Sequence, residues 1–341
     1  MAVQTSSAVT PAQLWRMSHG VILAQALYAA ARLGIADLLD GPPRQISELA
    51  ARLNVNEPAL LRLMRLLATQ DVFEETTPGA FTHTGLSQFL RTGVPGSVRS
   101  ILIFRGSEFF YPPFGEILYT LETGLPAREK LYGKNVFEHL KEDPEGARIF
   151  DDAMTNTCEL LGPAIAAAYD FGAWGSLMDV GGGNGLMLAT ILKAHPRLQG
   201  VLADLPQVLE RTRERGFLQG ELESRCILQP CDFFQEVPPG CRAYLMKSVI
   251  HDWDDERAYK ILVNCRRAVP RNGVLLLAEW VLPDSNLTGP GRFMDIAMMV
   301  LTGGKERSDQ EYGKLLDRAG FRLNGAFPVP GEFHIIEALP V

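Results

Sequence analysis

A cluster of glycines between two acidic residues has the composition of a ligand-binding turn. The glycines are Gly181, Gly182, Gly183 and Gly185, and they follow the short apolar run 177–180. Their pattern is G-x-G-x-G, which lacks the last spacing of the dinucleotide fingerprint G-x-G-x-x-G. The glycine spacing alone therefore leaves the identity of the ligand open.

Two carboxylates narrow the choice of ligand. Asp179, just before the glycines, would repel a pyrophosphate and attract a cation. Asp204 ends the next apolar run, where an acidic side chain can accept hydrogen bonds from both hydroxyls of a ribose. These residues favour a ligand that carries a ribose and a positive charge. The alternative is that the glycines form only a tight turn and that the two aspartates cap helices.

Apolar runs of strand length alternate with helical segments from residue 176 onward. The alternation predicts an α/β fold with a doubly wound sheet, whose ligand lies beyond the carboxyl ends of the strands. Five polar residues fall at that edge by sequence position: Asp179, Asp204, Asp232, His251 and Glu279. The predicted strands lie within 176–181, 199–204, 225–232, 242–250, 273–282, 322–329 and 333–339.

The N-terminal part has the pattern of a helical domain with a small β wing. Residues 11–40 have helical periodicity and are mostly apolar, so they need a partner surface and indicate a dimer. Residues 46–75 predict helix, turn and helix, and 76–84 predict a wing, which together give a winged-helix outline. The second helix carries only Arg62 and Arg65 among apolar residues, which favours burial over contact with DNA.

Composition and charge exclude several classes of protein. The 341 residues include 33 basic and 40 acidic side chains, a net charge of −7, and no basic run indicates a nucleic-acid or membrane surface. The five cysteines are odd in number and form no C-x-x-C pair, so neither a disulfide framework nor a zinc site is indicated. The N-terminus lacks the pattern of a leader, and no apolar stretch is long enough to span a bilayer. We therefore expect a soluble, cytoplasmic protein without a nucleic-acid or membrane partner.

Taken as a set, the motifs resemble those of the S-adenosylmethionine-dependent small-molecule O-methyltransferases, a family shared by plant phenolic enzymes and bacterial natural-product enzymes. The resemblance covers nearly the whole chain. It implies a winged-helix-like dimerisation domain at 1–100, a helical bridging and acceptor-pocket segment at 101–170, and a Rossmann-like catalytic domain at 171–341. It also implies a homodimer. The motifs that carry it, in order, are DVGGGNG at 179–185, ADLP at 203–206, CDFF at 231–234, MKSVIHDWDDE at 246–256, LAEWVLP at 277–283 and GGKERS at 303–308.

The resemblance implies a site for S-adenosylmethionine and its product S-adenosylhomocysteine. In this family the glycines surround the methionine part, Asp204 binds the ribose, Asp232 and Phe233 hold the adenine, and Lys247 faces the methionine carboxylate. Without the resemblance, Asp232 is equally a turn residue and Lys247 a surface lysine. The complete cofactor set is Asp179, Gly181, Gly183, Gly185, Asp204, Leu205, Asp232, Phe233 and Lys247.

The resemblance also implies a general base, His251, with Glu279 and Glu306 as the two acids that flank it. These acids would hydrogen-bond the imidazole, fix its tautomer and support the imidazolium. A histidine just after a buried strand is otherwise often a satisfied core residue.

Two further sets of side chains near this motif have alternative interpretations. Asp252, Asp254 and Asp255 suggest a metal site, but they precede an amphipathic segment at 256–269 and fit helix caps better, so we expect no metal. Methionines on helices are commonly core residues. Five residues nevertheless match positions of the family that line the acceptor pocket: Phe150, Met154, Asp252, Met298 and Met299.

The strength of the base selects the acceptor. Complete deprotonation of a phenol by a histidine costs on the order of 5 kcal/mol, and that of an aliphatic hydroxyl on the order of 12 kcal/mol. Proton loss concerted with attack could offset the smaller deficit. We therefore expect a small aromatic acceptor with a phenolic or enolic hydroxyl.

Two rival functions remain. Some members of the family bind the same cofactor yet hydroxylate or decarboxylate their substrates, and the cofactor motifs do not separate these outcomes. The complete set of His251, Glu279 and Glu306 favours methyl transfer, because that step requires a base. The other rival, a DNA-binding regulator that senses S-adenosylmethionine, depends on the winged-helix outline alone.

Overall fold

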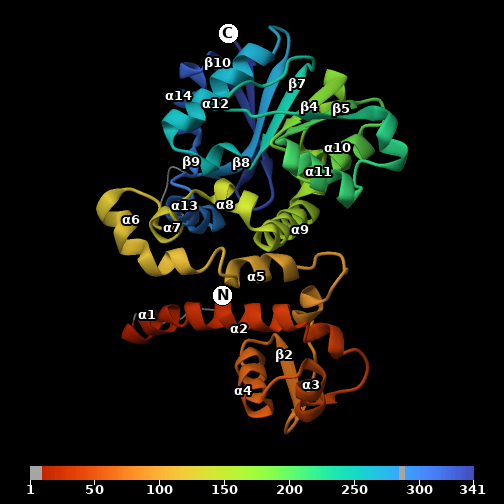
Figure 1. Ribbon diagram of the computed structural model, residues 1–341, viewed down its shortest axis with the longest axis vertical. Coiled ribbons are helices and arrows are strands. Elements are labelled where there is room, and N and C mark those ends of the chain that lie inside the picture. Colours follow the sequence, from red (N-terminus) through yellow and green to blue (C-terminus); the bar gives the residue numbers. More distant parts are fainter. Residues whose placement is uncertain (1–9, 284–288) are drawn as a thin grey trace, which may run out of the picture. The chain divides into compact units, whose positions relative to one another are not determined.

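The computed structural model describes residues 10–283 and 289–341. The chain forms two compact units, Met1–Tyr111 and Pro112–Val341, which are described separately below (Figure 1). Across the described ranges, no helix combines the length and the apolar character that crossing a bilayer requires.

The first unit is mainly helical and contains a small antiparallel sheet with the strand order β1-β3-β2. The predicted helix–turn–helix and wing are confirmed. Asn54 ends the first helix of the motif in a left-handed conformation, and the side chain of Asn56 caps the second by accepting a hydrogen bond from Ala59 N. The elements are α1 (Pro11–Ser18), α2 (Gly20–Leu33), η1 (Ala36–Leu38), β1 (Arg44–Gln45), α3 (Ile46–Leu53), α4 (Glu57–Ala68), β2 (Phe73–Thr77), β3 (Ala80–His83), η2 (Ser87–Leu90) and α5 (Arg99–Gly106).

The helical stretch predicted over 11–40 is interrupted. It divides at His19 into α1 and α2, and α2 ends where Gly34 takes a φ of 67°. Glycine adopts this left-handed conformation without a side-chain clash, which makes it a common helix terminator. On α1 within this unit, three large apolar side chains are mostly exposed: Leu14, Trp15 and Met17.

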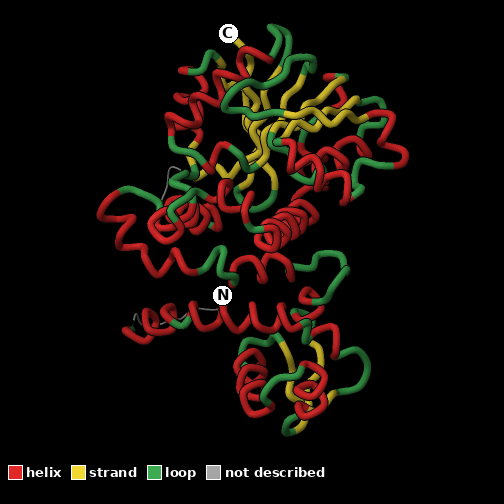
Figure 2. Tube along the Cα trace, viewed as in Figure 1, coloured by secondary structure: helices red, strands yellow, loops and turns green. Residues whose placement is uncertain are grey.

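The second unit contains an α/β sheet with the strand order β10-β11-β8-β7-β4-β5-β6, and the short strand β9 pairs with β8. Figure 2 shows these strands as one sheet with helices on both of its faces. The strands and helices at the sheet are β4 (Ser176–Val180), α10 (Leu186–Ala194), β5 (Gln199–Asp204), α11 (Pro206–Arg215), η5 (Gly220–Arg225), β6 (Cys226–Pro230), β7 (Ala243–Lys247), η6 (Ile250–Asp252), α12 (Asp255–Ala268), β8 (Val274–Leu282), β9 (Arg307–Ser308), α14 (Asp309–Arg318), β10 (Phe321–Val329) and β11 (Phe333–Pro340).

The sheet combines parallel strands with an antiparallel edge. Strands β4 to β8 pair in parallel, whereas β11 runs antiparallel to β8 and β10 antiparallel to β11. The reason is local, because only residues 330–332 separate β10 from β11 and a parallel crossover needs a dozen or more residues. The predicted doubly wound sheet is therefore present, and its last two strands form a hairpin.

Helices pack two hydrophobic cores against the sheet. One core contains apolar residues of α12 and α14, such as Ile261 and Leu315, and the other contains residues of α9 and α10, such as Ile165 and Leu188. Both cores include fully buried side chains of the central strands, because a parallel strand is covered on both faces. The remaining elements of this unit are η3 (Pro112–Glu116), α6 (Ile117–Thr123), α7 (Ala127–Tyr132), α8 (Val136–Glu142), α9 (Pro144–Ala168), η4 (Phe171–Trp174) and α13 (Pro290–Leu301).

Candidate active site

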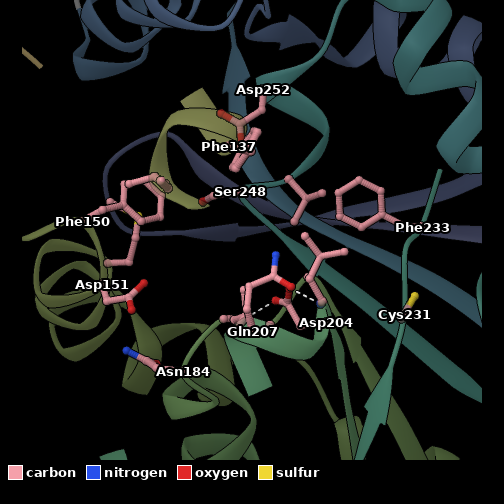
Figure 3. Close-up of a pocket in the computed structure, with 18 of the residues that line it drawn as sticks. Phe137, Phe150, Asp151, Asn184, Asp204, Gln207, Cys231, Phe233, Ser248 and Asp252 are labelled. Carbon is pink, nitrogen blue, oxygen red and sulfur yellow. Dashed lines mark hydrogen bonds between the residues drawn. The ribbon is translucent and has the colours of Figure 1, made fainter. Parts of the chain in front are cut away.

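A cavity of about 360 Å³ lies in the second unit, where β4, β5, β6 and β7 end. This is the edge that the sequence predicted for a ligand, because the carboxyl ends of parallel strands meet there. Helices α8 and α9 supply further wall residues. Figure 3 shows Phe150 and Asp151 on one side of the cavity, Phe233 and Cys231 on the opposite side, and Asp252 at one end.

The glycine turn after β4 is held by the carboxylate of Asp204. Its Oδ2 accepts a hydrogen bond from Gly183 N at 2.9 Å, and its Oδ1 accepts one from Leu205 N at 2.7 Å. Gly183 has a φ of 59°, and a Cβ atom built on it would meet nothing within 4 Å. The space beside Gly183 is therefore open to a ligand. The carboxylate of Asp204 retains lone pairs that can accept hydrogen bonds from ribose hydroxyls.

Asp179 is a buried carboxylate on the cavity wall. It is 1% exposed, and neither of its oxygens has a hydrogen-bond partner among the described residues. Burial raises the pKa of Asp179 to about 7, Lys247 opposes the rise and Asp204 adds to it. An unpartnered buried carboxylate fits a ligand that brings a cationic or hydrogen-bond-donating group, as the methionine part of S-adenosylmethionine does.

The far side of the cavity is formed by the turn after β6. The Oδ1 atom of Asp232 accepts a hydrogen bond from Phe234 N at 2.9 Å, so this residue does shape the turn, and it also lines the cavity. Phe233 packs near Phe234 and Trp253, with centroid distances of 5.2 and 6.4 Å. A carboxylate beside an aromatic ring suits a flat heterocycle with an exocyclic amine.

Most residues predicted for the cofactor and acceptor line this one cavity. They are Asp179, Gly181, Gly183, Asp204, Leu205, Asp232, Phe233, Lys247, Phe150, Met154 and Asp252. Gly185 lies outside the wall and forms the N-cap of α10. Met298 and Met299 lie on α13 and are not part of the wall either.

His251 is bonded to Glu306 in a buried cluster next to the cavity. Its Nδ1 lies 2.7 Å from Glu306 Oε1 and 3.9 Å from Glu279 Oε2, and its Nε2 lies 3.9 Å from Asp252 Oδ1. His251 is 7% exposed and is not itself a wall residue, although Val249 and Asp252 on either side of it are. Nδ1 of His251 is therefore hydrogen-bonded to the carboxylate of Glu306, and Nε2 is the nitrogen that remains available to take a proton.

The three carboxylates control the charge of the imidazole. Burial by itself lowers the pKa of His251, but the charges of Glu306, Glu279 and Asp252 and the hydrogen bond to Glu306 outweigh it, so the pKa is raised. Burial also raises the pKa of Glu279 to about 7 and that of Asp252 to about 6, in each case against the attraction of His251. The cluster thus favours the imidazolium and stabilises it once a proton has been taken.

Glu279 also holds the turn that carries His251. Its Oε1 accepts hydrogen bonds from Val249 N at 3.0 Å and from Ile250 N at 2.8 Å, and the residue is fully buried on β8. The parallel pairing of Lys247 with Ala278 places β8 alongside this turn. Glu279 therefore both holds the backbone of this turn through hydrogen bonds and raises the pKa of His251 through its charge.

The acidic residues after His251 divide between the cavity and the helix. Asp254 caps α12, since its Oδ1 accepts from Arg257 N at 2.8 Å, as predicted. Asp255 pairs with Arg307 and Lys305. In the described part of the chain, one group of side chains has ligand atoms close enough to hold a metal ion, and it consists of His251, Glu279 and Glu306. Their ligand atoms lie within 4.8 Å of one another. Two members of this group, His251 and Glu306, are hydrogen-bonded to each other.

Comparison with known proteins identifies the family. A model described as the O-methyltransferase domain matches residues 120–322, and one described as the O-methyltransferase dimerisation domain matches residues 15–93. The chain belongs to the O-methyltransferase family. Phenazine O-methyltransferase PhzM of Lysobacter antibioticus is 38% identical to this methyltransferase over 96% of each chain.

Solved structures agree with this assignment. LaPhzM superimposes with a TM-score of 0.92 at 38% identity, over 97% of this chain and 99% of the other. NcsB1, an O-methyltransferase from neocarzinostatin biosynthesis, has a TM-score of 0.83 at 32% identity over 98% and 100% of the two chains. It was solved with S-adenosyl-L-homocysteine and 1,4-dihydroxy-2-naphthoic acid. The predicted family, Rossmann-like fold, O-methyltransferase activity and cofactor are confirmed.

The cavity of the methyltransferase also includes residues that the sequence did not single out. Asn184 of the glycine turn donates to Thr155 Oγ1 on α9, and Ser248, just after β7, has a φ of 52°. Trp253 is buried, and its Nε1 has no partner within the described ranges. Asn184, Ser248 and Trp253 all lie inside the motifs that carry the family resemblance, so the sequence could have predicted their place at the site.

Another missed pair joins α9 to α11. Arg211 Nε lies 2.6 Å from Asp151 Oδ2, and both residues line the cavity. No short-range pattern pairs residues 60 positions apart, so the sequence of the methyltransferase offered no signal for this contact.

Proposed function

We propose that this O-methyltransferase moves a methyl group from S-adenosylmethionine to a phenolic or enolic hydroxyl of a small aromatic acceptor, with His251 as general base. The observation that carries the proposal is the buried hydrogen bond between His251 Nδ1 and Glu306 beside a cavity lined by the cofactor motifs. S-adenosylmethionine, when bound, supplies a methyl carbon attached to a positively charged sulfur. The residues of the chain then have to position the acceptor and take its proton.

Each part of the cavity has a role that its chemistry supports. The glycine turn and Lys247 would hold the methionine part of the cofactor. The buried side chain of Asp179 would supply a carboxylate next to it. Asp204 would accept from the ribose hydroxyls, and Asp232 with Phe233 would hold the adenine. These roles require only residues that line one cavity of about 360 Å³, a volume in the range of small-molecule sites.

The proton of the acceptor goes to Nε2 of His251 in this scheme. Nδ1 is bonded to Glu306, so the tautomer that leaves Nε2 free is the one the buried carboxylate selects. Glu279 and Asp252 add negative charge that stabilises the imidazolium after the transfer. Asp252 is the link between the cluster and the cavity, because it belongs to the cavity wall and lies 3.9 Å from Nε2.

An aromatic acceptor is supported by the wall near Asp252. Phe137 and Trp253 stack with a centroid distance of 5.3 Å, and Phe150 and Met154 come from α9. Such a wall suits a flat apolar molecule. The acceptors named for the relatives, a phenazine and a dihydroxynaphthoic acid, are of this kind and support a natural-product acceptor. The alternatives of hydroxylation, decarboxylation and DNA binding find no support among these relatives.

We also propose a homodimer. The chain carries the dimerisation domain of its family at 15–93, and on α1 the side chains of Leu14, Trp15 and Met17 are 74%, 71% and 75% exposed. Apolar side chains of this size on one short helix favour burial against a second copy. Light scattering should give twice the chain mass at micromolar concentration. A W15E variant should shift toward the monomer, and a wild type that is monomeric throughout would contradict the proposal.

The activity is tested by counting methyl groups transferred from labelled cofactor to a panel of phenols, quinones and hydroxyindoles. Calorimetry should show clear binding of S-adenosylhomocysteine and negligible binding of NAD and NADP. Incorporation of label into a phenolic hydroxyl is the expected result. An acceptor that is consumed without gaining label would favour hydroxylation or decarboxylation.

A further inference from the structure

Arg307 is a buried arginine next in sequence to Glu306, and its side chain is fully withdrawn from solvent. A guanidinium has five N–H donors in a fixed planar fork, and all five are costly to bury without acceptors. The sequence motif at 303–308 contributes only Glu306 to the predicted site and predicts no role for its arginine.

The guanidinium binds the turn that carries His251. Nη1 donates to Ile250 O at 3.2 Å and Nη2 donates to Trp253 O at 2.9 Å. These carbonyls precede and follow His251 along the chain. A single side chain from the strand that follows Glu306 therefore restrains the turn on both sides of the imidazole.

The other donors of Arg307 fix the guanidinium itself. Nε and Nη2 donate to Asp255 Oδ1 at 3.0 and 2.8 Å, and Nη1 donates to Lys305 O at 3.3 Å. The five bonds use the whole fork. Arg307 thus has no donor left for a substrate, which makes it a positioning residue rather than a catalytic one.

A second contact from the same segment supports this role. Gly304 packs so closely on the turn that a Cβ atom at this position would lie 2.0 Å from His251 O and 2.5 Å from Asp252 C. Real Cβ atoms do not approach backbone atoms so closely, so any side chain here has to push the turn away. Gly304, Glu306 and Arg307 therefore contact the backbone, the imidazole and the flanking carbonyls of one turn.

We propose that Arg307, with Gly304, sets the distance between His251 and Glu306 and thereby the tautomer and orientation of the base. Glu306 and Arg307 are adjacent in the chain. The hydrogen bonds from Arg307 to the turn of His251 therefore also hold Glu306 close to the imidazole with which it is hydrogen-bonded. The kinetic part of the proposal rests on His251 being the base, whereas the geometric part does not.

The test compares R307K, R307M and G304A with two matched controls. R318M removes an arginine that pairs with Glu256 and is 48% exposed, and G115A adds a methyl group where nothing lies within 4 Å. The first readout is the Nδ1 proton of His251 in proton NMR of histidine-labelled protein, assigned with H251Q. A hydrogen bond to a buried carboxylate moves this resonance downfield. The second readout is kcat beside the affinity for S-adenosylhomocysteine.

R307K keeps the charge but cannot reach both carbonyls in a fork, and G304A keeps the guanidinium but displaces the turn. Each should lose or shift the downfield resonance and lower kcat by about 10- to 100-fold, while the affinity for S-adenosylhomocysteine changes less than about threefold. The controls should match wild type in both readouts. A merely structural role would lower the melting temperature without moving the resonance of the folded protein.

The outcomes separate this proposal from the proposed function. Should R307M fail to fold, R307K and G304A still decide. A folded R307K and G304A with the wild-type resonance would overturn the positioning role. A resonance that moves while kcat stays at the wild-type value would support the geometry and remove His251 from the reaction.

Discussion

The Nδ1 atom of His251 lies 2.7 Å from Oε1 of Glu306, a residue 55 positions later in the chain, and both side chains are buried. A hydrogen bond of this length to a carboxylate fixes one tautomer of the imidazole and leaves Nε2 as its reactive nitrogen. Replacement of His251 by alanine should therefore lower methyl transfer by about 10²- to 10⁴-fold, the usual contribution of a positioned base. Cofactor affinity should hardly change, because His251 is not a wall residue of the cavity.

The measurement is single-turnover transfer of labelled methyl groups to a phenol, with titration of S-adenosylhomocysteine as the control. E279Q and E306Q should reduce the rate less than H251A, since each leaves the imidazole in place. An alanine variant as fast as wild type would exclude His251 from the mechanism.

The pH dependence of the reaction should reflect the three carboxylates around His251. A base has to be neutral before it takes a proton, and Glu306, Glu279 and Asp252 raise the pKa of His251 above its ordinary value of 6.5. The value of kcat/KM for the acceptor should therefore rise with pH through a range above 6.5. In E306Q one raising charge and the hydrogen bond are lost, so the rising limb should move to lower pH. A limb at the same pH in both proteins would contradict the assignment of the titrating group to this cluster.

Asp179 should cost stability at neutral pH. Burial raises its pKa to about 7, so between pH 4 and 7 the folded state binds more protons than the unfolded state, and stability falls as pH rises through this range. One pKa unit corresponds to about 1.4 kcal/mol. Because asparagine also buries polar atoms, D179N should raise the free energy of unfolding at pH 7.5 by only about 1–2 kcal/mol. Denaturant unfolding without cofactor measures it.

The same substitution should weaken binding of S-adenosylhomocysteine by about tenfold or more, the common exchange of stability against function at a binding site. D232N is the control for stability, because Asp232 is exposed and its asparagine retains an acceptor for Phe234 N. A D179N protein less stable than wild type at pH 7.5 would show that Asp179 has a stabilising partner.

The ion pair between Asp151 and Arg211 should contribute to cofactor binding. It joins α9 to α11 at the cavity, and both charges act on the pKa of Asp204, with Arg211 lowering it and Asp151 raising it after the larger effect of burial. R211M should weaken binding of S-adenosylhomocysteine by about threefold to fivefold, as expected for a partly exposed pair worth about 1 kcal/mol or less. The neighbouring pair of Arg215 with Asp152 joins the same helices but lies outside the cavity wall, so R215M is a matched control.

A double-mutant cycle of R211M and D151N separates the pair from its single effects. Added salt should weaken binding to wild type more than to the double variant, because the ion pair is screened. If R211M and R215M weaken the binding of S-adenosylhomocysteine equally, the contact between α9 and α11 affects binding and the charge of Arg211 at the cavity does not.

The element types, the order of the strands along the chain and the cofactor motifs could all be predicted from the amino-acid sequence. These features depend on short-range patterns. An apolar strand, a glycine turn and a following helix are encoded within about twenty residues, and Asp179, Gly183 and Asp204 fall at one sheet edge because parallel strands end together. The caps of α4 and α12 by Asn56 and Asp254 are equally local.

The contacts between side chains that are distant in the sequence depend on the tertiary structure. The contact of His251 with Glu306, the pairing of Asp151 with Arg211 and the hold of Arg307 on the turn of His251 each join residues more than 50 positions apart. Met298 and Met299 lie on α13 and are not among the residues that line this cavity, so their place in the acceptor pocket stays a prediction from the family motifs. Periodicity fixes the face of a helix on which a residue lies, but the packing of α13 and of the loop after it sets the distance to other elements. That packing results from the summed burial of many side chains, which no local pattern in the sequence records.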